Sequence, residues 1–305
     1  MRIGINGSSL IALGRPSSEI VAHAAAAEAD GFDTYWVAQL AVPDALTVLG
    51  AVGAATSRIE LGTAVVPTWL RHPLMLAAQA LTTAELCGGR LALGIGLAHK
   101  PWVEGTLRIP FDRPALHMDE YLSVLLPAMR DRSVSFEGSI WSGEVEQLGG
   151  PRDVAAPSVL LAAMGPRMLE LAGSRTDGTI LWLSGPRTIE SRIAPALTAA
   201  ARAADRPAPR IVASVPVCVT DRPDEVRAMV GDVLAGYNEL PSYRGVLDTE
   251  GADGPADVAV IGDEDAVRAG IERFAEAGAT DFSALEFAVD DETAARTRDL
   301  LKQLR

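Results

Sequence analysis

The sequence has few residues that bind metals or form disulfides, with two cysteines and four histidines among 305 residues. The cysteines, Cys87 and Cys218, stand alone and have neither metal-ligand spacing nor the pattern of a disulfide framework. The sequence also contains no GxSxG elbow and no phosphate-binding P-loop. These absences argue against metal, acyl-transfer and kinase chemistry, and we expect a protein of the reducing cytoplasm.

Long apolar runs and an excess of positive charge are also missing. No stretch of about 18 uncharged apolar residues occurs, so we expect no membrane span. Residues 1–16 break early at glycine and suit a first strand and loop better than a signal peptide. The net charge of −13 repels nucleic acid and anionic membranes. An anionic ligand must therefore be held by local amides, helix N-termini and a few arginines.

Short apolar segments without polar alternation are present instead, as in parallel strands buried on both faces. The eight candidate strands are Arg2–Asn6, Thr34–Val37, Ile59–Val65, Arg90–Gly94, Ser158–Ala162, Gly178–Trp182, Arg210–Val217 and Asp281–Leu285. Helical segments separate them, which predicts an α/β fold with one closed (β/α)₈ barrel, a TIM barrel, over residues 1–305. An open doubly wound sheet is the alternative, but the glycine-rich turn that such sheets carry after the first strand is missing.

Two regions interrupt this alternation and are predicted to be insertions in the barrel. Residues 97–114 form a long segment rich in proline and aromatic residues, which we expect to be a loop before a helix at Ala115–Met129. Residues 133–157 contain Phe136-Glu137-Gly138 and Ile140-Trp141, a pattern typical of a small hairpin.

The segment Ile59–Trp102 holds the first candidate site, because ligands of parallel α/β sheets bind beyond the carboxyl ends of the strands. Ala64 and Val65, at the end of the third strand, are either plain barrel packing or a bulge that supports a planar ring. Gly94 and Gly96, which end the fourth strand, could let such a ring approach the backbone, or could only ease a turn.

Histidines and other cationic or aromatic side chains follow these strands. His99 could transfer protons near neutral pH, although a lone loop histidine more often has no catalytic role. His72 is a second catalytic candidate, and its alternative role is to cap the helix that begins at Pro73. Arg71 and Trp69 could contact a cofactor from the same loop.

Two strand-to-helix turns resemble anion-binding cradles. The first runs from Leu161 to Arg167 and includes Met164, Gly165 and Pro166, and the second runs from Trp182 to Thr188. Each has Gly-Pro-Arg at a helix start, where free amides and the positive end of the helix dipole attract a phosphate. Either turn alone would be ordinary, but two in adjacent units of a chain with charge −13 favour phosphate binding.

These motifs together resemble a known family. The segments LGTAVVPTWLRHP, CGGRLALGIG, AAMGPRM and DGTILWLSGPRT are similar to those of the luciferase-like flavin and deazaflavin enzymes. Within that family they resemble specifically the actinobacterial branch that uses coenzyme F420. The resemblance extends from RIGI near the start to GATDF near the end.

The resemblance implies a barrel that is often dimeric, with the cofactor ring on a third-strand bulge that contains a non-proline cis peptide. The Ala64–Val65 bond is the candidate here, and Gly94, Gly96, Leu97 and Ala98 would pass beside the ring. The family's phosphate contacts correspond to Gly165, Pro166 and Arg167 in the first turn. In the second turn they correspond to Leu183, Ser184 and Gly185.

Three positions depart from the family's sugar-phosphate and alcohol dehydrogenases. Gln39 and Leu40 stand where those enzymes tend to have an acidic residue and a histidine, and Leu97 falls near their catalytic glutamate. Their substrates are therefore not carried over. His72, His99 or Tyr243 could supply a proton instead, or the reaction could need only a hydride and solvent.

Three functions follow from this pattern. The first is an F420-dependent oxidoreductase that moves a hydride to or from a small-molecule substrate. The second is an FMN-dependent monooxygenase that works with a flavin reductase. The third is a non-catalytic barrel that binds a cofactor or supports a partner enzyme. For all three we expect a homodimer and no metal, nucleic-acid or membrane partner.

Overall fold

Eight parallel strands form a closed barrel in the computed structural model, which describes residues 1–40, 42–150 and 153–305. In barrel order they are β1 (Arg2–Asn6), β2 (Thr34–Val37), β3 (Glu60–Thr63), β5 (Leu91–Gly96), β8 (Ser158–Leu161), β9 (Gly178–Trp182), β10 (Arg210–Val219) and β12 (Asp281–Glu286). Parallel pairing of β9 with β10 and of β12 with β1 closes the ring. The predicted TIM barrel is confirmed, with each strand at its expected place.

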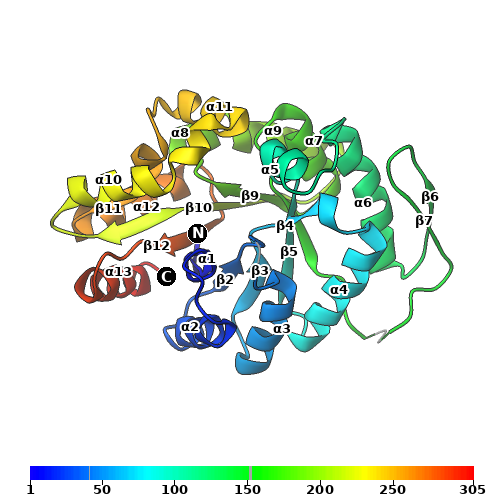
Figure 1. Cartoon of the computed structure of the whole chain (residues 1–305), viewed down its shortest axis with the longest axis horizontal. Coiled ribbons are helices and arrows are strands. Elements are labelled where there is room, and N and C mark those ends of the chain that lie inside the picture. The colour runs from blue at the N-terminus through cyan, green and yellow to red at the C-terminus, as the bar shows by residue number, and fades with distance from the viewer. Residues whose placement is uncertain (41, 151–152) are drawn as a thin grey trace.

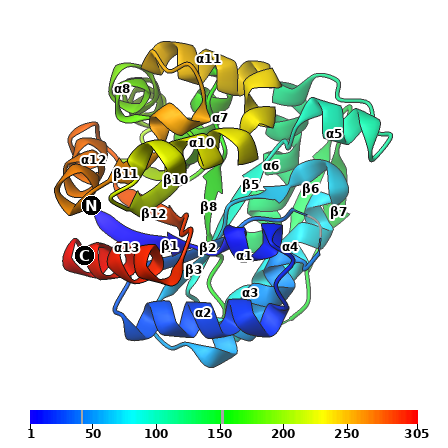
Figure 2. The ribbon, with the colours of Figure 1, turned by 60° about the vertical axis from the view of Figure 1, so that its left-hand side comes forward.

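Helices surround the strands, as Figures 1 and 2 show. The longer ones are α2 (Ser17–Ala29), α3 (Ala45–Ala55), α4 (Pro73–Leu86), α6 (Pro114–Arg130), α7 (Pro166–Arg175), α9 (Ala194–Ala203), α10 (Pro223–Val233), α11 (Pro241–Glu250), α12 (Glu264–Glu276) and α13 (Asp291–Gln303). Short ones are α1 (Ser8–Ala12), α5 (Lys100–Gly105) and α8 (Pro186–Thr188). Within the described ranges, no helix combines the length and apolar character that a bilayer crossing requires.

The barrel interior is packed with side chains, so it is not a channel. Trp36, Ala92, Leu160, Ile180 and Val212 form one buried cluster inside the ring of strands. Gly62 leaves room for the Trp36 ring, because a Cβ at position 62 would lie 2.2 Å from it. The larger part of the core lies between the strands and the surrounding helices.

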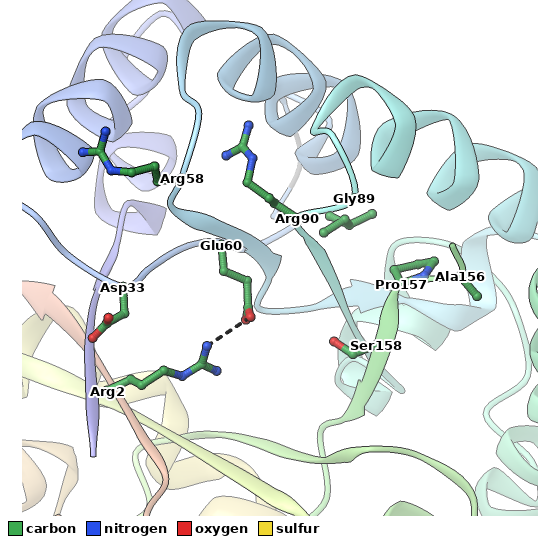
Figure 3. Close-up of a pocket in the computed structure, with 10 residues that line it drawn as sticks. Arg2, Asp33, Arg58, Glu60, Gly89, Arg90, Ala156, Pro157 and Ser158 are labelled. Carbon is green, nitrogen blue, oxygen red and sulfur yellow. Dashed lines mark hydrogen bonds and ion pairs between the residues drawn. The ribbon is translucent and has the colours of Figure 1, made fainter. Parts of the chain in front are cut away.

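The amino end of the barrel is closed by a ring of ion pairs. Arg2 lies 3.1 Å from Glu60 and 2.5 Å from Asp281, and Arg210 lies 2.9 Å from each of these carboxylates. A cavity of about 420 Å³ opens beside this ring, lined by Arg2, Asp33, Arg58, Glu60 and Arg90 among others (Figure 3). It lies at the amino ends of the strands, opposite the end where barrel enzymes bind ligands.

Both insertions are present, with one correction. The 97–114 segment is not all loop, because Pro101 in its first turn starts the short helix α5. The following helix α6 closely matches its prediction. In the second insertion, β6 (Val134–Glu137) and β7 (Ser142–Val145) pair antiparallel as the predicted hairpin. Residues 151 and 152 of that insertion lie outside the described residues.

The hairpin is attached to α6 by one carboxylate. Glu120 accepts hydrogen bonds from the amides of Ser139, Ile140 and Trp141 at 2.6–2.9 Å and from the Ser139 hydroxyl. Burial alone would raise the pKa of Glu120, but these bonds outweigh it and lower the pKa from 4.5 to about 2. The ionised carboxylate therefore stabilises the folded state.

Acid should weaken this attachment. A carboxyl with a lowered pKa contributes stability above pH 4.5, and that contribution is lost as the pH falls toward 2. We expect Glu120→Gln to lower the free energy of unfolding at pH 7 by roughly 1–3 kcal/mol. It should also flatten the dependence of stability on pH between 5 and 2. Urea unfolding at several pH values measures both, with the exposed Glu137→Gln as control, and an unchanged slope in Glu120→Gln would refute this role.

Candidate active site

The third strand ends in a bulge at the carboxyl end of the barrel. After Thr63 the chain leaves the β-ladder and rejoins it at β4 (Val66–Pro67), which pairs with the end of β5. The fully buried Thr63 hydroxyl fills the gap, donating to Gly94 O at 2.7 Å and accepting from Gly94 N at 2.8 Å. The Ala64–Val65 peptide bond is cis, as the family resemblance implies.

The bulge presents a small, half-buried surface to the carboxyl-end face. Ala64 and Val65 both pack on the cluster inside the barrel while remaining partly exposed. Backbone bonds fix the bulge to the segment after β2, from Ala64 N to Val37 O at 2.9 Å and from Gln39 N to Val65 O at 3.2 Å. This surface can support a planar ring, which is the role predicted for Ala64 and Val65.

The two glycines of β5 make room for the bulge. A Cβ on Gly94 would lie 2.0 Å from Thr63 O, and one on Gly96 would lie 2.8 Å from a Val65 methyl. Their missing side chains therefore make room for Thr63 and Val65, and a contact of these glycines with a cofactor ring stays a prediction. Of the residues that follow, Leu97 packs on the main core, and Ala98 has a left-handed backbone with φ of 57°.

An aromatic cluster stands over the same end of the barrel. His99 lies 5.9 Å from Tyr237 and 5.7 Å from Tyr243, measured between ring centroids. Tyr237, in η3 (Ala235–Glu239), also lies 4.7 Å from Tyr243 on α11 and 6.4 Å from Trp182. Sequence reasoning missed Tyr237 as a site residue, because no motif near it signals that it lies against His99.

The cluster holds its titratable groups neutral. Burial lowers the pKa of His99, so its imidazole is uncharged at pH 7. Burial raises the pKa of Tyr237 and of Tyr243, so both phenols keep their protons. Of the three proton donors named from the sequence, His99 and Tyr243 are thus brought together.

The third candidate, His72, has a different setting. It caps α4, where Nδ1 accepts from Leu74 N at 3.2 Å and Nε2 lies 3.1 Å from the carbonyl of Ser142. Both ring nitrogens are engaged, so the geometry favours the capping role over proton transfer. The other two residues named from this loop also have partners within the protein. The Trp69 ring stacks on the His117 ring with 3.6 Å between their centroids, and Arg71 forms an ion pair with Asp44.

Gln39 has a structural role at the position where related dehydrogenases carry an acid. Its side-chain oxygen accepts from Ala45 N at 2.8 Å, at the start of α3. An amide does not titrate in the physiological range, and neighbouring Leu40 is an exposed apolar residue. Neither residue can replace the acid and base of those enzymes.

The first anion cradle is open. Gly165 precedes α7, and a Cβ at this position would meet nothing within 4 Å. Among the described residues, no group accepts a hydrogen bond from the amides of Arg167 and Met168. The Arg167 side chain is 79% exposed and forms an ion pair with Glu170 at 3.0 Å, so the cradle consists mainly of backbone.

The second cradle already holds an anion from the chain itself. The carboxylate of Glu250, the last residue of α11, accepts from Arg187 N at 3.2 Å and from Thr188 N at 2.8 Å. Leu183 N bonds to Ser214 O at 3.1 Å, and its side chain is buried in the core. The two turns look equivalent in sequence, but the first is open and the second is occupied by a carboxylate. No residue near the second Gly-Pro-Arg motif indicates that Glu250 binds there.

The carboxyl-end face fits a flat, anionic cofactor. The Ala64–Val65 bulge can seat a ring, and the unbonded amides of α7 can take a phosphate. The Ser184 hydroxyl is fully buried without a hydrogen-bond partner in the part of the chain that the structure describes. No group of three or more metal-binding side chains occurs within those same residues.

Sequence comparisons point to one family. The profile of the luciferase-like monooxygenases matches residues 4–281. A Mycobacterium tuberculosis protein, provisionally named as a coenzyme F420-dependent oxidoreductase, is 40% identical over 101 residues. That match covers 33% of this chain and 29% of the relative, so it spans less than a third of the relative's length.

Solved structures with the same fold bind different cofactors. The coenzyme F420-dependent tetrahydromethanopterin reductase of Methanopyrus kandleri has a TM-score of 0.79 and 21% identity, over 99% of this chain and 97% of that one. The oxygenating constituent of 3,6-diketocamphane monooxygenase from Pseudomonas putida, solved with FMN, has a TM-score of 0.78 and 18% identity. The match covers 99% of this chain and 97% of that one. At these identities the likeness shows the shared fold alone.

Proposed function

Since this chain belongs to the luciferase-like monooxygenase family of oxidoreductases, we propose that it is a coenzyme F420-dependent oxidoreductase acting on a small organic substrate. The observation that carries the proposal is the half-exposed Ala64–Val65 bulge at the carboxyl end of the barrel. The named relative supports the deazaflavin over FMN as the cofactor.

The protein's own contribution is to bind and orient. Val65 and Ala64 would support the ring, while the amides of Arg167 and Met168 and the positive end of α7 would hold the phosphate. When bound, the deazaflavin supplies the hydride-transfer chemistry. The apolar and aromatic surroundings of His99 suit a small, fairly apolar acceptor such as an activated alkene or an imine.

Proton transfer falls to the neutral groups of the aromatic cluster. His99 is the stronger candidate, because an uncharged imidazole can both donate and accept a proton. Tyr243 is the alternative donor, and its raised pKa keeps it protonated. Proton transfer by either His99 or Tyr243 needs no charged group beside the cofactor ring.

Replacing His99 tests this assignment. We expect His99→Phe, which keeps an aromatic ring against Tyr237 and Tyr243, to lower turnover about tenfold or more. Cofactor affinity should change little, because the imidazole is not part of the proposed cradle. Turnover is measured with reduced F420 and an acceptor found by screening alkenes and imines. His72→Gln is the control and should keep the wild-type rate. An unaltered rate in His99→Phe would exclude His99 as the group that transfers the proton.

Gly165 tests the open cradle. We expect Gly165→Ala to leave the melting temperature nearly unchanged, because a Cβ there would contact nothing within 4 Å. It should weaken F420 binding several-fold if the phosphate approaches this backbone. Arg167→Ala should also weaken binding, by a smaller factor, since its side chain is exposed. Fluorescence titration measures these affinities, and Gly105→Ala, at another open glycine, should bind normally. Unchanged affinity in Gly165→Ala would argue against the cradle.

The choice of cofactor is tested by titrating the purified protein separately with F420 and with FMN. The proposal predicts saturable binding of F420 and weak binding of FMN. Tight FMN binding without F420 binding would instead support the monooxygenase, and binding of neither would support a non-catalytic barrel. A homodimer, a cytoplasmic location and a small-molecule substrate remain predictions from the sequence.

A further inference from the structure

The carboxylate of Glu250 occupies hydrogen-bond donors of the kind that a phosphate would use. Helix α8 continues without a break through the π-helical η2 (Ile189–Ile193) into α9, so one helical segment spans residues 186–203. Its first free amides, of Arg187 and Thr188, both donate to Glu250. The Thr188 hydroxyl adds a third bond at 2.9 Å.

The position of Glu250 shows that these donors hold it in place. It is the last residue of α11, where the negative end of the helix dipole disfavours a carboxylate. The positive end of the α8 segment offsets this cost. A Cβ on Gly185 would lie 2.4 Å from the Glu250 carboxylate carbon, so the carboxylate rests directly on the turn.

A second feature of the same turn points to a ligand. Ser184, which adjoins Gly185, is fully buried, and its hydroxyl has no hydrogen-bond partner among the residues described. Glu250 satisfies the amides beyond Gly185 but forms no bond to this hydroxyl. The turn therefore contains a buried hydroxyl without a hydrogen-bond partner, one residue before the glycine on which the carboxylate rests.

We propose that Glu250 is a built-in competitor of the cofactor phosphate and thereby sets the affinity of this chain for phosphate-bearing flavins and deazaflavins. A phosphate on this turn must displace the carboxylate, because both anions would need the same amides of Arg187 and Thr188. Glu250 is partly exposed, so its side chain can move into solvent. The inference rests on the proposed function, because it assumes that the ligand carries a phosphate.

Binding measurements on the full chain test the competition. We expect Glu250→Gln, which keeps a hydrogen-bond acceptor without the charge, to bind F420 and FMN about fivefold or more tightly than wild type. Riboflavin, which has the FMN ring without the phosphate, should show no such gain. Glu239→Gln removes an exposed carboxylate from the nearby η3 and should behave as wild type. Unchanged or weaker binding of the phosphate-bearing ligands by Glu250→Gln would overturn the proposal.

Inorganic phosphate separates this inference from the proposed function. If neither F420 nor FMN binds to any variant, the proposed function fails, but the competition can still be measured. The melting temperature of Glu250→Gln should then rise more steeply with increasing phosphate than the melting temperatures of wild type and Glu239→Gln, which report the general stabilisation by this salt. If the melting temperature of Glu250→Gln instead lies below that of wild type by the same amount at every phosphate concentration, Glu250 is only a helix cap. That result would refute the competition.

Discussion

Gly94→Ala is expected to destabilise the protein by about 3 kcal/mol, one of the two largest effects that we predict. The added methyl would lie 2.0 Å from the carbonyl oxygen of Thr63 and 3.2 Å from a Val65 methyl. The nearer neighbour is backbone, so it cannot rotate away as a side chain could. Relief requires that the bulge itself move, and with it the surface proposed to seat the ring.

Urea unfolding followed by tryptophan fluorescence measures this loss of stability. Gly165→Ala is the matched control, because the same substitution there meets open space and should leave the free energy of unfolding almost unchanged. The Gly94→Ala protein that remains folded should also bind F420 more weakly. Equal stability of the two variants would contradict the packing described for β5.

Thr63→Val is expected to cost roughly 2–6 kcal/mol of stability, although valine nearly matches threonine in shape. The Thr63 hydroxyl bonds to both the amide and the carbonyl of Gly94, where the bulge interrupts the ladder between β3 and β5. Valine would leave two buried backbone groups without partners. Each such group costs about 1–3 kcal/mol.

The control for this substitution is Thr82→Val, on the exposed face of α4, where the hydroxyl bonds only to Ala78 O within its own helix. It should change the free energy of unfolding by less than about 0.5 kcal/mol. Thermal and urea unfolding of the two variants give the comparison. If Thr63→Val were as mild as Thr82→Val, the hydroxyl would not be what holds the bulge.

The barrel was predictable because its strands have a local signature. A segment such as Leu91–Gly96 is buried on both faces, so it is apolar throughout and stands out from the helices beside it. The cis bond at Ala64–Val65 was predictable only through the family resemblance. Composition and spacing alone favoured plain barrel packing at these residues.

The rest of the site depends on contacts between distant segments, which no local pattern encodes. Glu250 reaches the turn after β9 from the end of α11, and it distinguishes two Gly-Pro-Arg turns that look alike in sequence. Tyr237 approaches His99 from η3 in the same way. The close approach of the Thr63 carbonyl to Gly94 could not be predicted for a similar reason, since it also joins two separate strands.

The central claim is that the carboxyl-end face, and not the cavity at the amino end, binds a phosphate-bearing deazaflavin. A crystal structure of the protein with oxidised F420 tests it most directly. We predict electron density for the ring against Ala64 and Val65, with a phosphate within hydrogen-bond distance of the amides of Arg167 and Met168. Density for the cofactor in the cavity beside Arg2 and Glu60, or for a phosphate away from α7, would contradict the account.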